Sequence, residues 1–321
     1  MASIRKTKTG YRAEVCVNGV RDSGTFDTSR EAKAWASMRE TDLRNSGGNP
    51  SGNLRVSDLL DRYEREVSPS KRGARWETLR LRAMSELPIG SVRVCDVTER
   101  NVSEWRDARS KIVQSGTVRR EMVLLSHVFE TARREWKLVY SNPCKDVRRP
   151  KQPPARDRRI TDDEAQRICW ALGWYYGQPV TQSRHRVAVA FLFAIETAMR
   201  AGEICGIRPE HITGRTVILP MTKNGKPRTV PLSSKALELL SFLPAGYFEL
   251  ESRTLDTLFR RGRDAAKVEG LTFHDARHEA ITRMASIFNP LELARVVGHS
   301  NLNQLLSYYN KSAADLADML L

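Results

Sequence analysis

Two breaks rich in turn-forming residues divide the chain and limit what it can fold into. Residues 45–53 read Asn-Ser-Gly-Gly-Asn-Pro-Ser-Gly-Asn, and residues 148–159 hold three prolines among five arginines. Glycine and asparagine favour turns, while proline interrupts helices and sheets. The breaks therefore predict linkers between three modules, at residues 1–48, 54–150 and 158–321.

Length and apolar content favour folded domains over disorder. The chain has 321 residues, of which 40% are hydrophobic, enough for real cores. The longest uncharged apolar run, residues 187–195, is too short for a membrane span, and the basic start lacks the apolar stretch of a secretion signal. The five scattered cysteines form no CxxC pair. We expect a cytoplasmic protein without disulfides or structural zinc.

The charge is strongly positive and unevenly spread. Lys and Arg number 53 against 38 Asp and Glu, which gives a net charge of +15. Our count assigns +3 to residues 1–50, +10 to residues 51–160 and +2 to residues 161–321. Such an excess favours a polyanionic partner, most often nucleic acid. A merely solvated basic surface is the alternative.

The three modules predict an α+β fold that is mainly α. Alternating residues around the turn Asn18-Gly19, followed by a capping pattern at 28–31, predict a small three-stranded sheet with one helix. The second module repeats apolar residues every three or four positions and predicts a helical domain. In the third, a capping box at 161–164 opens a mostly helical domain, interrupted by a β hairpin with its tip at Asn224-Gly225.

Several polar residues of the third module suggest chemistry. Arg200 follows the long apolar run and would share a helical face with Glu203, as a buried ion pair or as a ligand-binding pair. Lys223 precedes the hairpin tip and, with Lys226 and Arg228, forms a basic finger. Taken alone, a hairpin lysine carries little information.

The segment His274-Asp-Ala-Arg277-His278 places a histidine and an arginine three positions apart. The pair His274 and His278 resembles a metal pair, but the interior glutamate of HExxH is missing and Arg277 would oppose a cation. We therefore interpret His274 and Arg277 as an anion-binding pair.

The last motif begins at Gly298-His299 and ends at Tyr308-Tyr309. If residues 302–309 form a helix, Leu302, Leu305 and Leu306 share a buried stripe with Tyr309, and Tyr308 points about 100° away. Tyr309 would then belong to the core, and Tyr308 would be free to react.

Taken together and in this order, these motifs resemble the tyrosine recombinases, specifically phage-type integrases. Residues 117–122, the Val128-Phe129 helix and the stretch from Asn142-Pro143 to 147–150 resemble the family's core-binding domain. The first module resembles an arm-binding domain by its pattern alone. The resemblance implies an arm-type DNA-binding domain (1–48), a core-binding domain (54–150) and a catalytic domain (158–321).

The resemblance also assigns roles to residues. It implies Tyr308 as nucleophile, Arg200 and Arg277 as a phosphate clamp, and Lys223 as general acid. His274 and His299 would be supporting donors, and Glu203 would support the first arginine. The implied product is a 3′-phosphotyrosyl link with a free 5′ hydroxyl, formed without metal, ATP or other cofactor.

These roles suit phosphoryl transfer. Attack on a phosphodiester builds negative charge, which fixed guanidiniums can bind through paired N–H groups. The phenol must lose its proton as it attacks, and the leaving 5′ oxygen must gain one, which a hairpin lysine can deliver.

We expect a site-specific integrase that integrates and excises a phage or mobile element. The resemblance implies double-stranded DNA attachment sites and a homotetramer, with a host DNA-bending protein and a directionality factor as possible further partners. The stripe Ala313, Leu316, Ala317 and Leu320 would dock on a neighbour or on its own domain. The alternatives are a resolvase or invertase of the same family, against which the separate first module argues, and a non-catalytic basic DNA-binding protein.

Overall fold

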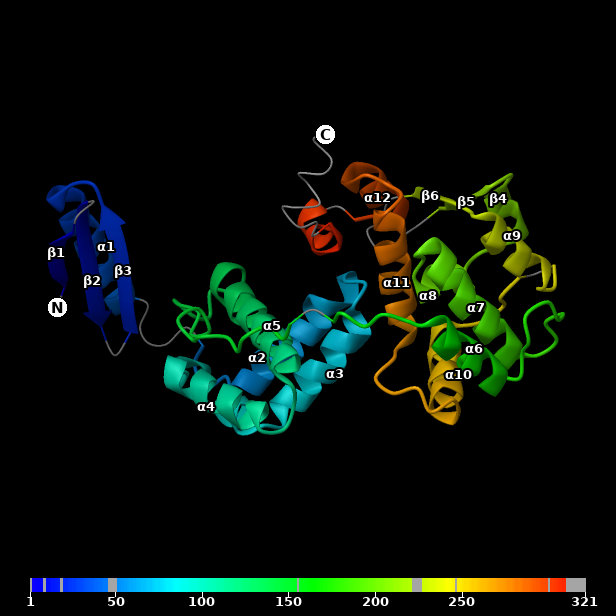
Figure 1. The fold of residues 1–321 in the computed structure, drawn as a ribbon. Coiled ribbons are helices and arrows are strands. Elements are labelled where there is room, and N and C mark those ends of the chain that lie inside the picture. The colour runs from blue at the N-terminus through cyan, green and yellow to red at the C-terminus, as the bar shows by residue number, and fades with distance from the viewer. Residues whose placement is uncertain are drawn as a thin grey trace, which may run out of the picture. The chain divides into compact units, whose positions relative to one another are not determined.

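The structure is a computed structural model, and it divides into two compact units, residues 1–155 and 156–321, each of which is described by itself (Figure 1). The described residues are 2–7, 10–17, 20–45, 51–154, 156–220, 227–245, 247–299 and 301–309. The hairpin tips at 18–19 and 224–225, Lys223 and the stripe at 313–320 lie outside them. The mainly helical α+β fold predicted from the sequence is confirmed.

Unit 1 begins with a three-stranded antiparallel sheet covered by one helix, as predicted (Figure 1). Strands β1 (Ser3–Thr7), β2 (Gly10–Val17) and β3 (Val20–Phe26) pair in that order, and α1 (Ser29–Asn45) packs against β2 and β3. Alternate β2 side chains are buried under the helix because side chains in a strand point to opposite faces. This core consists of Ala13, Val15, Val17, Ala32, Ala36 and Leu43.

The rest of unit 1 is helical and has a hydrophobic cluster of its own. Its helices are α2 (Val56–Glu66), α3 (Ala74–Ser85), α4 (Glu99–Ser110) and α5 (Ser115–Arg134), joined by short 3-10 turns at 68–70, 88–91 and 94–96. The predicted apolar spacing holds for most positions, but Leu79 is exposed rather than buried. The module boundaries at 48, 54 and 150 stay predictions.

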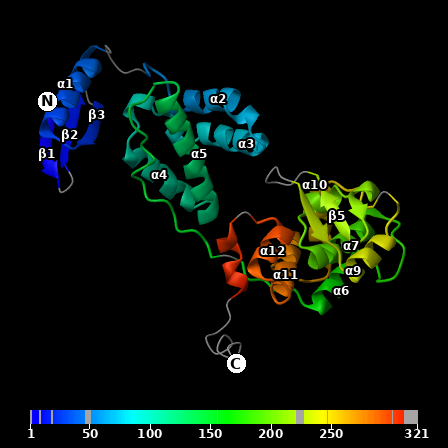
Figure 2. The same ribbon diagram turned by 90° about the horizontal axis from the view of Figure 1, so that it is seen from above.

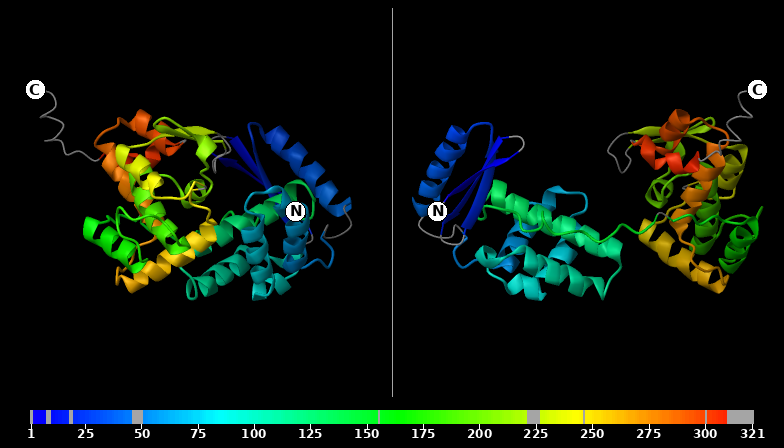
Figure 3. Two further views of the ribbon diagram at one scale, coloured as in Figure 1. Left: turned by 90° about the vertical axis from the view of Figure 1, so that its right-hand side faces the viewer. Right: turned by 60° about the vertical axis from the view of Figure 1, so that its left-hand side comes forward.

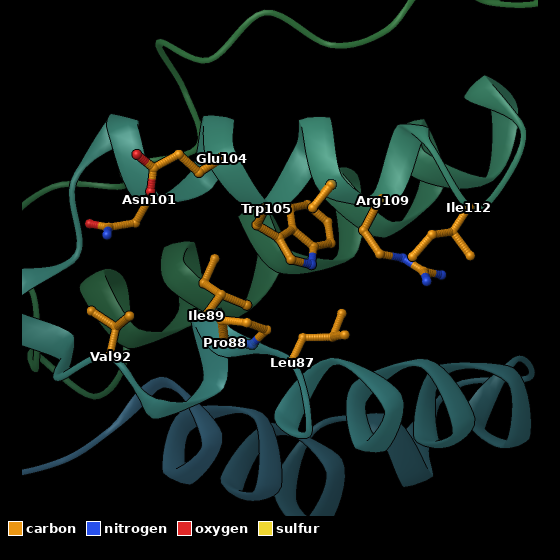
Figure 4. Close-up of a pocket in the computed structure, with 10 residues that line it drawn as sticks. Leu87, Pro88, Ile89, Val92, Asn101, Glu104, Trp105, Arg109 and Ile112 are labelled. Atoms are coloured by element: carbon orange, nitrogen blue, oxygen red, sulfur yellow. The ribbon is translucent and has the colours of Figure 1, made fainter.

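A buried carboxylate and an apolar cavity lie in this helical part. Glu121 on α5 accepts two hydrogen bonds from Arg109 at 2.9 Å each and one from Arg80 at 3.2 Å. The cavity, of about 310 Å³, lies beside Trp105 of α4 and is lined mainly by apolar side chains (Figure 4). It contains none of the residues singled out as catalytic candidates.

Unit 2 is built around α7 (Ser183–Thr197), which is buried on nearly all sides. Helices α6 (Asp162–Ala171), α9 (Ser234–Ser241), α10 (Ser252–Ala265) and α11 (Phe273–Ala285) pack against it. Helix α12 (Pro290–Val297) lies beside α11 (Figure 2). The apolar run of residues 187–195 explains the burial, because over this stretch the helix is apolar on all sides. Unit 2 also contains α8 (Ala201–Cys205), the 3-10 turn η4 (Pro209–His211), and strands β4 (Ile212–Thr213), β5 (Thr216–Leu219) and β6 (Arg228–Pro231).

The basic linker lacks regular secondary structure wherever the structure describes it. Its described residues, 148–154 and 156–159, form neither helix nor strand and run as extended coil (Figure 3). In the parts of the chain that the structure describes, no helix is long and apolar enough to cross a membrane.

Candidate active site

Arg200 is presented by a sharp break between α7 and α8. Ala198 ends α7 with a φ of 55°, a left-handed conformation that a non-glycine residue adopts only under local strain. Arg200 then caps α8. Its backbone N–H donates to Glu203 at 2.8 Å, and its Nη1 donates to the other carboxylate oxygen at 2.9 Å. The predicted pairing of Arg200 with Glu203 is therefore present.

Arg228 also binds Glu203, and the sequence did not suggest this. Its Nη2 donates to Glu203 at 2.7 Å and its Nη1 donates to the carbonyl of Val297. The side chain is buried, so the interpretation of Arg228 as part of an exposed basic finger is wrong. The alternation along β6 was an available signal, because Arg228 lies on the same strand face as the buried Val230.

Arg277 lies at the centre of the site, on α11, with only 3% of its surface exposed. It donates to the carbonyl oxygens of Ala198, through Nη1, and of Val297, through Nη2 at 2.6 Å. Burial, followed by the positive charges of Arg200 and Arg228, lowers the pKa of Arg277 to about 9. A guanidinium has five N–H donors, so Arg277 keeps others for an anion.

Gly298 and His299 follow α12 directly. Gly298 has a φ of 68°, and a Cβ there would lie 2.6 Å from Nη1 of Arg228, so glycine is required both by the backbone conformation and by the packing. Burial, followed by the charges of Arg277, Arg200 and Arg228, lowers the pKa of His299 to about 4. Its Nδ1 is buried without a hydrogen-bond partner among the described residues. The neutral ring therefore has an unused polar atom beside a cluster of cations.

His274 and His278 occupy different surroundings on α11. His274 is exposed, and desolvation together with the charge of Arg277 lowers its pKa. The ring of His278 packs on that of Tyr308, with their centroids 5.0 Å apart, and its Nδ1 is buried without a partner among the described atoms. In the described parts of the chain, no group of three or more His, Cys, Asp or Glu side chains could hold a metal ion.

Tyr308 lies next to this cluster, but not on the helix that we expected. Residues 302–309 form two 3-10 turns, η5 (Leu302–Gln304) and η6 (Leu306–Tyr308), and of the expected leucine stripe only Leu305 is buried. The helical prediction was therefore wrong here. Asn301 caps the first turn by accepting from the N–H of Asn303 at 3.0 Å, which favours a short turn at this point.

The two neighbouring tyrosines differ in what their side chains contact. The hydroxyl of Tyr309 donates to the carbonyl of Phe288 at 2.7 Å, so it is tied to the fold. The ring of Tyr308 is half-buried against His278. Burial raises the pKa of Tyr308, and the charge of Arg277 opposes that rise. An arginine close enough to favour the phenolate is what a tyrosine nucleophile needs.

The described site thus combines three guanidiniums, a supporting carboxylate, histidines and a phenol. Three of its polar atoms are buried without hydrogen-bond partners among the described residues, namely Arg228 Nε, His278 Nδ1 and His299 Nδ1. Buried polar groups are normally paired, so this group favours an anionic ligand. Lys223 lies outside the described residues, and its expected place beside the site stays a prediction.

Comparisons with known proteins point to one family. The profile of the phage integrase family matches residues 158–244. A putative integrase/recombinase of Haemophilus influenzae is 37% identical over 99% of this chain and 89% of its own length. A shufflon-specific DNA recombinase of Escherichia coli is 35% identical over 84% of this chain and 73% of its own.

The fold agrees with these relatives. A lambda integrase structure, described as a tetramer bound to a Holliday junction, matches 97% of this chain and 96% of its own with a TM-score of 0.65 at 19% sequence identity. From the sequence similarity over nearly its whole length, together with this fold, the chain belongs to the phage integrase family and is a tyrosine-type site-specific DNA recombinase.

Proposed function

We propose that this recombinase cuts and rejoins DNA with Tyr308 as its nucleophile and with Arg200 and Arg277 as its phosphate clamp. One observation carries the proposal: the charges of Arg200 and Arg277 both act on His299, and the charge of Arg277 also acts on Tyr308. Arg277 is held there by the carbonyls of Ala198 and Val297. Glu203 orients Arg200 through two hydrogen bonds and binds Arg228 through a third. The arrangement supplies fixed positive charge where a phosphodiester under attack gains negative charge.

The reaction conserves the phosphodiester energy. The Tyr308 oxygen attacks phosphorus and loses its proton, the bond from phosphorus to the 5′ oxygen breaks, and that oxygen takes up a proton to become a hydroxyl. The reverse attack by a 5′ hydroxyl of another strand rejoins the DNA and releases Tyr308. We assign the proton donor to Lys223 and supporting hydrogen bonds to His274 and His299.

The modules would divide the work of holding DNA. We propose that residues 54–150 and 158–321 bind a core attachment site, with affinity supplied mainly by phosphate contacts of the +10 region. A homotetramer acting on two sites in the bacterial cytoplasm is consistent with the tetramer seen for lambda integrase. A host bending protein and a directionality factor stay predictions.

The outcome of recombination divides two candidates. We favour integration and excision of a phage or mobile element because the sequence has a separate first module. Inversion or resolution is the second candidate, and the shufflon-specific recombinase among the relatives is the observation in its favour. The DNA on either side of the gene would decide between them, since an integrated element carries attachment sites at its ends.

The first test of the proposed chemistry is a covalent adduct that forms without metal. Incubating the protein with a supercoiled plasmid that carries the DNA flanking its gene, then adding detergent, should trap protein on DNA. Mass spectrometry after nuclease digestion should place the phosphate on Tyr308. EDTA should leave the yield unchanged, since no step uses a metal. A chelator-sensitive yield, or a phosphate on another residue, would refute this chemistry.

A second test concerns residues 1–48 as an arm-type DNA-binding module. Deleting them should leave adduct formation at the core site within about twofold, because the candidate catalytic residues all lie in unit 2. Binding to distal arm sites should be lost, as measured by footprinting on the flanking DNA. Footprints that survive the deletion unchanged would rule out the arm-binding role.

A further inference from the structure

Two buried carboxylates lie on α11, the helix that carries the candidate residues His274 and Arg277. Asp275 and Glu279 are one helical turn apart on α11 and are only 3% and 1% exposed. His274, Arg277 and His278 lie on the same stretch of the helix. A buried carboxylate without a cation is costly and would attract the nearest guanidinium.

Two arginines of the basic linker pair with these carboxylates, and Arg283 of α11 itself also binds Glu279 at 2.8 Å. Arg156 donates from Nε and Nη2 to the two oxygens of Asp275, at 3.1 and 2.9 Å. Arg159 donates in the same bidentate way to Glu279, at 2.7 and 3.0 Å. Such paired bonds fix both distance and orientation.

Further contacts hold the same stretch in place. The backbone N–H of Ile160 donates to Glu279 at 3.2 Å, and Arg158 binds Glu164 on α6. The bonds from Arg159 and Arg283 lower the pKa of Glu279 to about 2, although burial alone would raise it. Residues 156–160, here called the linker strap, are thus fastened to unit 2 along their length.

The strap also reaches the neighbourhood of the nucleophile. Burial raises the pKa of Tyr308 against the charge of Arg277, and the negative charge of Asp157 on the strap adds to that rise. Arg156 and Arg159 therefore bind carboxylates on α11, and Arg158 between them binds Glu164 on α6. Asp157 acts on the candidate nucleophile through its charge. The strap is the first segment of unit 2.

We propose that Arg156 and Arg159 are positioning residues of the recombinase. By binding Asp275 and Glu279 they hold α11, and with it His274 and Arg277, in the position that the reaction needs. The inference rests on the proposed function. For these two arginines it also argues against a place among the phosphate contacts of the +10 region, because their guanidiniums already bind carboxylates within unit 2.

The experiment compares Arg156→Ala and Arg159→Ala with Arg260→Ala. Arg260 is a matched control, since its side chain is 56% exposed, against 55% and 57% for the strap arginines, and it binds the exposed carboxylate of Asp256. All three variants remove one positive charge. The flanking-DNA plasmid serves as the probe, and three quantities are measured: the single-turnover rate of adduct formation at saturating DNA, the salt dependence of DNA affinity, and the melting temperature.

We expect the rate of adduct formation to fall by about 10- to 100-fold in each strap variant, because small displacements of catalytic groups have effects of this size. The DNA affinity and its salt dependence should match those of the control variant. Arg159→Lys should recover part of the rate by restoring the charge. Two results would overturn the inference. The first is an unchanged rate of adduct formation together with a slope of log affinity against log salt that is smaller than the control's by about 0.9, which would mean a phosphate contact. The second is a lower melting temperature with an unchanged rate of adduct formation. A wild-type protein that forms no adduct would instead contradict the proposed function, and the inference with it.

Discussion

Tyr308→Phe is expected to abolish covalent protein–DNA adducts while leaving DNA binding intact. The change removes only the phenolic oxygen that attacks phosphorus. The ring stays, so its packing on His278, with centroids 5.0 Å apart, is preserved. Because the fold and the guanidiniums do not depend on that oxygen, binding to the flanking-DNA plasmid should match that of the wild-type protein, and adducts should fall below detection.

The neighbouring tyrosine supplies the matched control. Tyr309→Phe removes the hydrogen bond to the carbonyl of Phe288 and should cost about 0.5–1.5 kcal/mol of stability. Adducts should still form, because the hydroxyl of Tyr309 is tied to the fold and takes no part in attack. Adducts that persist in Tyr308→Phe but vanish in Tyr309→Phe would reverse the assignment of the nucleophile.

Removing either clamp arginine is expected to have the second largest effect. Arg200→Ala and Arg277→Ala should each lower the single-turnover rate of adduct formation by about 10²- to 10³-fold, the usual loss when one preorganised donor to a developing oxyanion is deleted. Arg277→Ala also leaves the carbonyl of Ala198 without this donor, whereas the carbonyl of Val297 keeps its bond from Arg228. An unsatisfied buried carbonyl costs about 1–3 kcal/mol, so this variant should also melt at a lower temperature.

The two effects of Arg277→Ala can be separated. Arg200 is partly exposed and bonds only to Glu203 among the described contacts, so Arg200→Ala should lose rate with little loss of stability. Arg263→Ala is the control for a lost carbonyl cap, since Arg263 donates to the carbonyl of Leu271 at 2.8 Å and is not one of the candidate catalytic residues. If Arg263→Ala lowered the rate as much as Arg200→Ala, the clamp assignment would be untenable.

Much of the local structure could be predicted because it depends on neighbours in the sequence. The capping box at Thr161 and Glu164 is present, with reciprocal bonds of 3.1 and 3.2 Å. The first sheet and its helix follow from alternation and a capping pattern at residues a few positions apart. The same reasoning failed for residues 302–309, where a helical spacing of leucines occurs in two short 3-10 turns.

The candidate site was only partly visible in the sequence. Arg200, Glu203, His274, Arg277, His299 and Tyr308 were singled out, and unit 2 holds them around a common cluster of charge. The buried pairing of Arg228 with Glu203, 25 residues away, and the packing of His278 on Tyr308 were missed. Both depend on distant segments meeting. The alternation along β6 could have indicated that Arg228 is buried, but not which residue it binds.

By itself the sequence determined most of the helices and strands, the ordered set of candidate residues and the positive charge, since each depends on residue type and short spacing. Only the tertiary structure decided which charges are free. Arg156 and Arg159 look like DNA-binding residues in a basic linker, yet they bind carboxylates 119 and 120 positions away. The physical reason is that the effect of a charge depends on what surrounds it after folding, and burial of Asp275 and Glu279 made these arginines their partners.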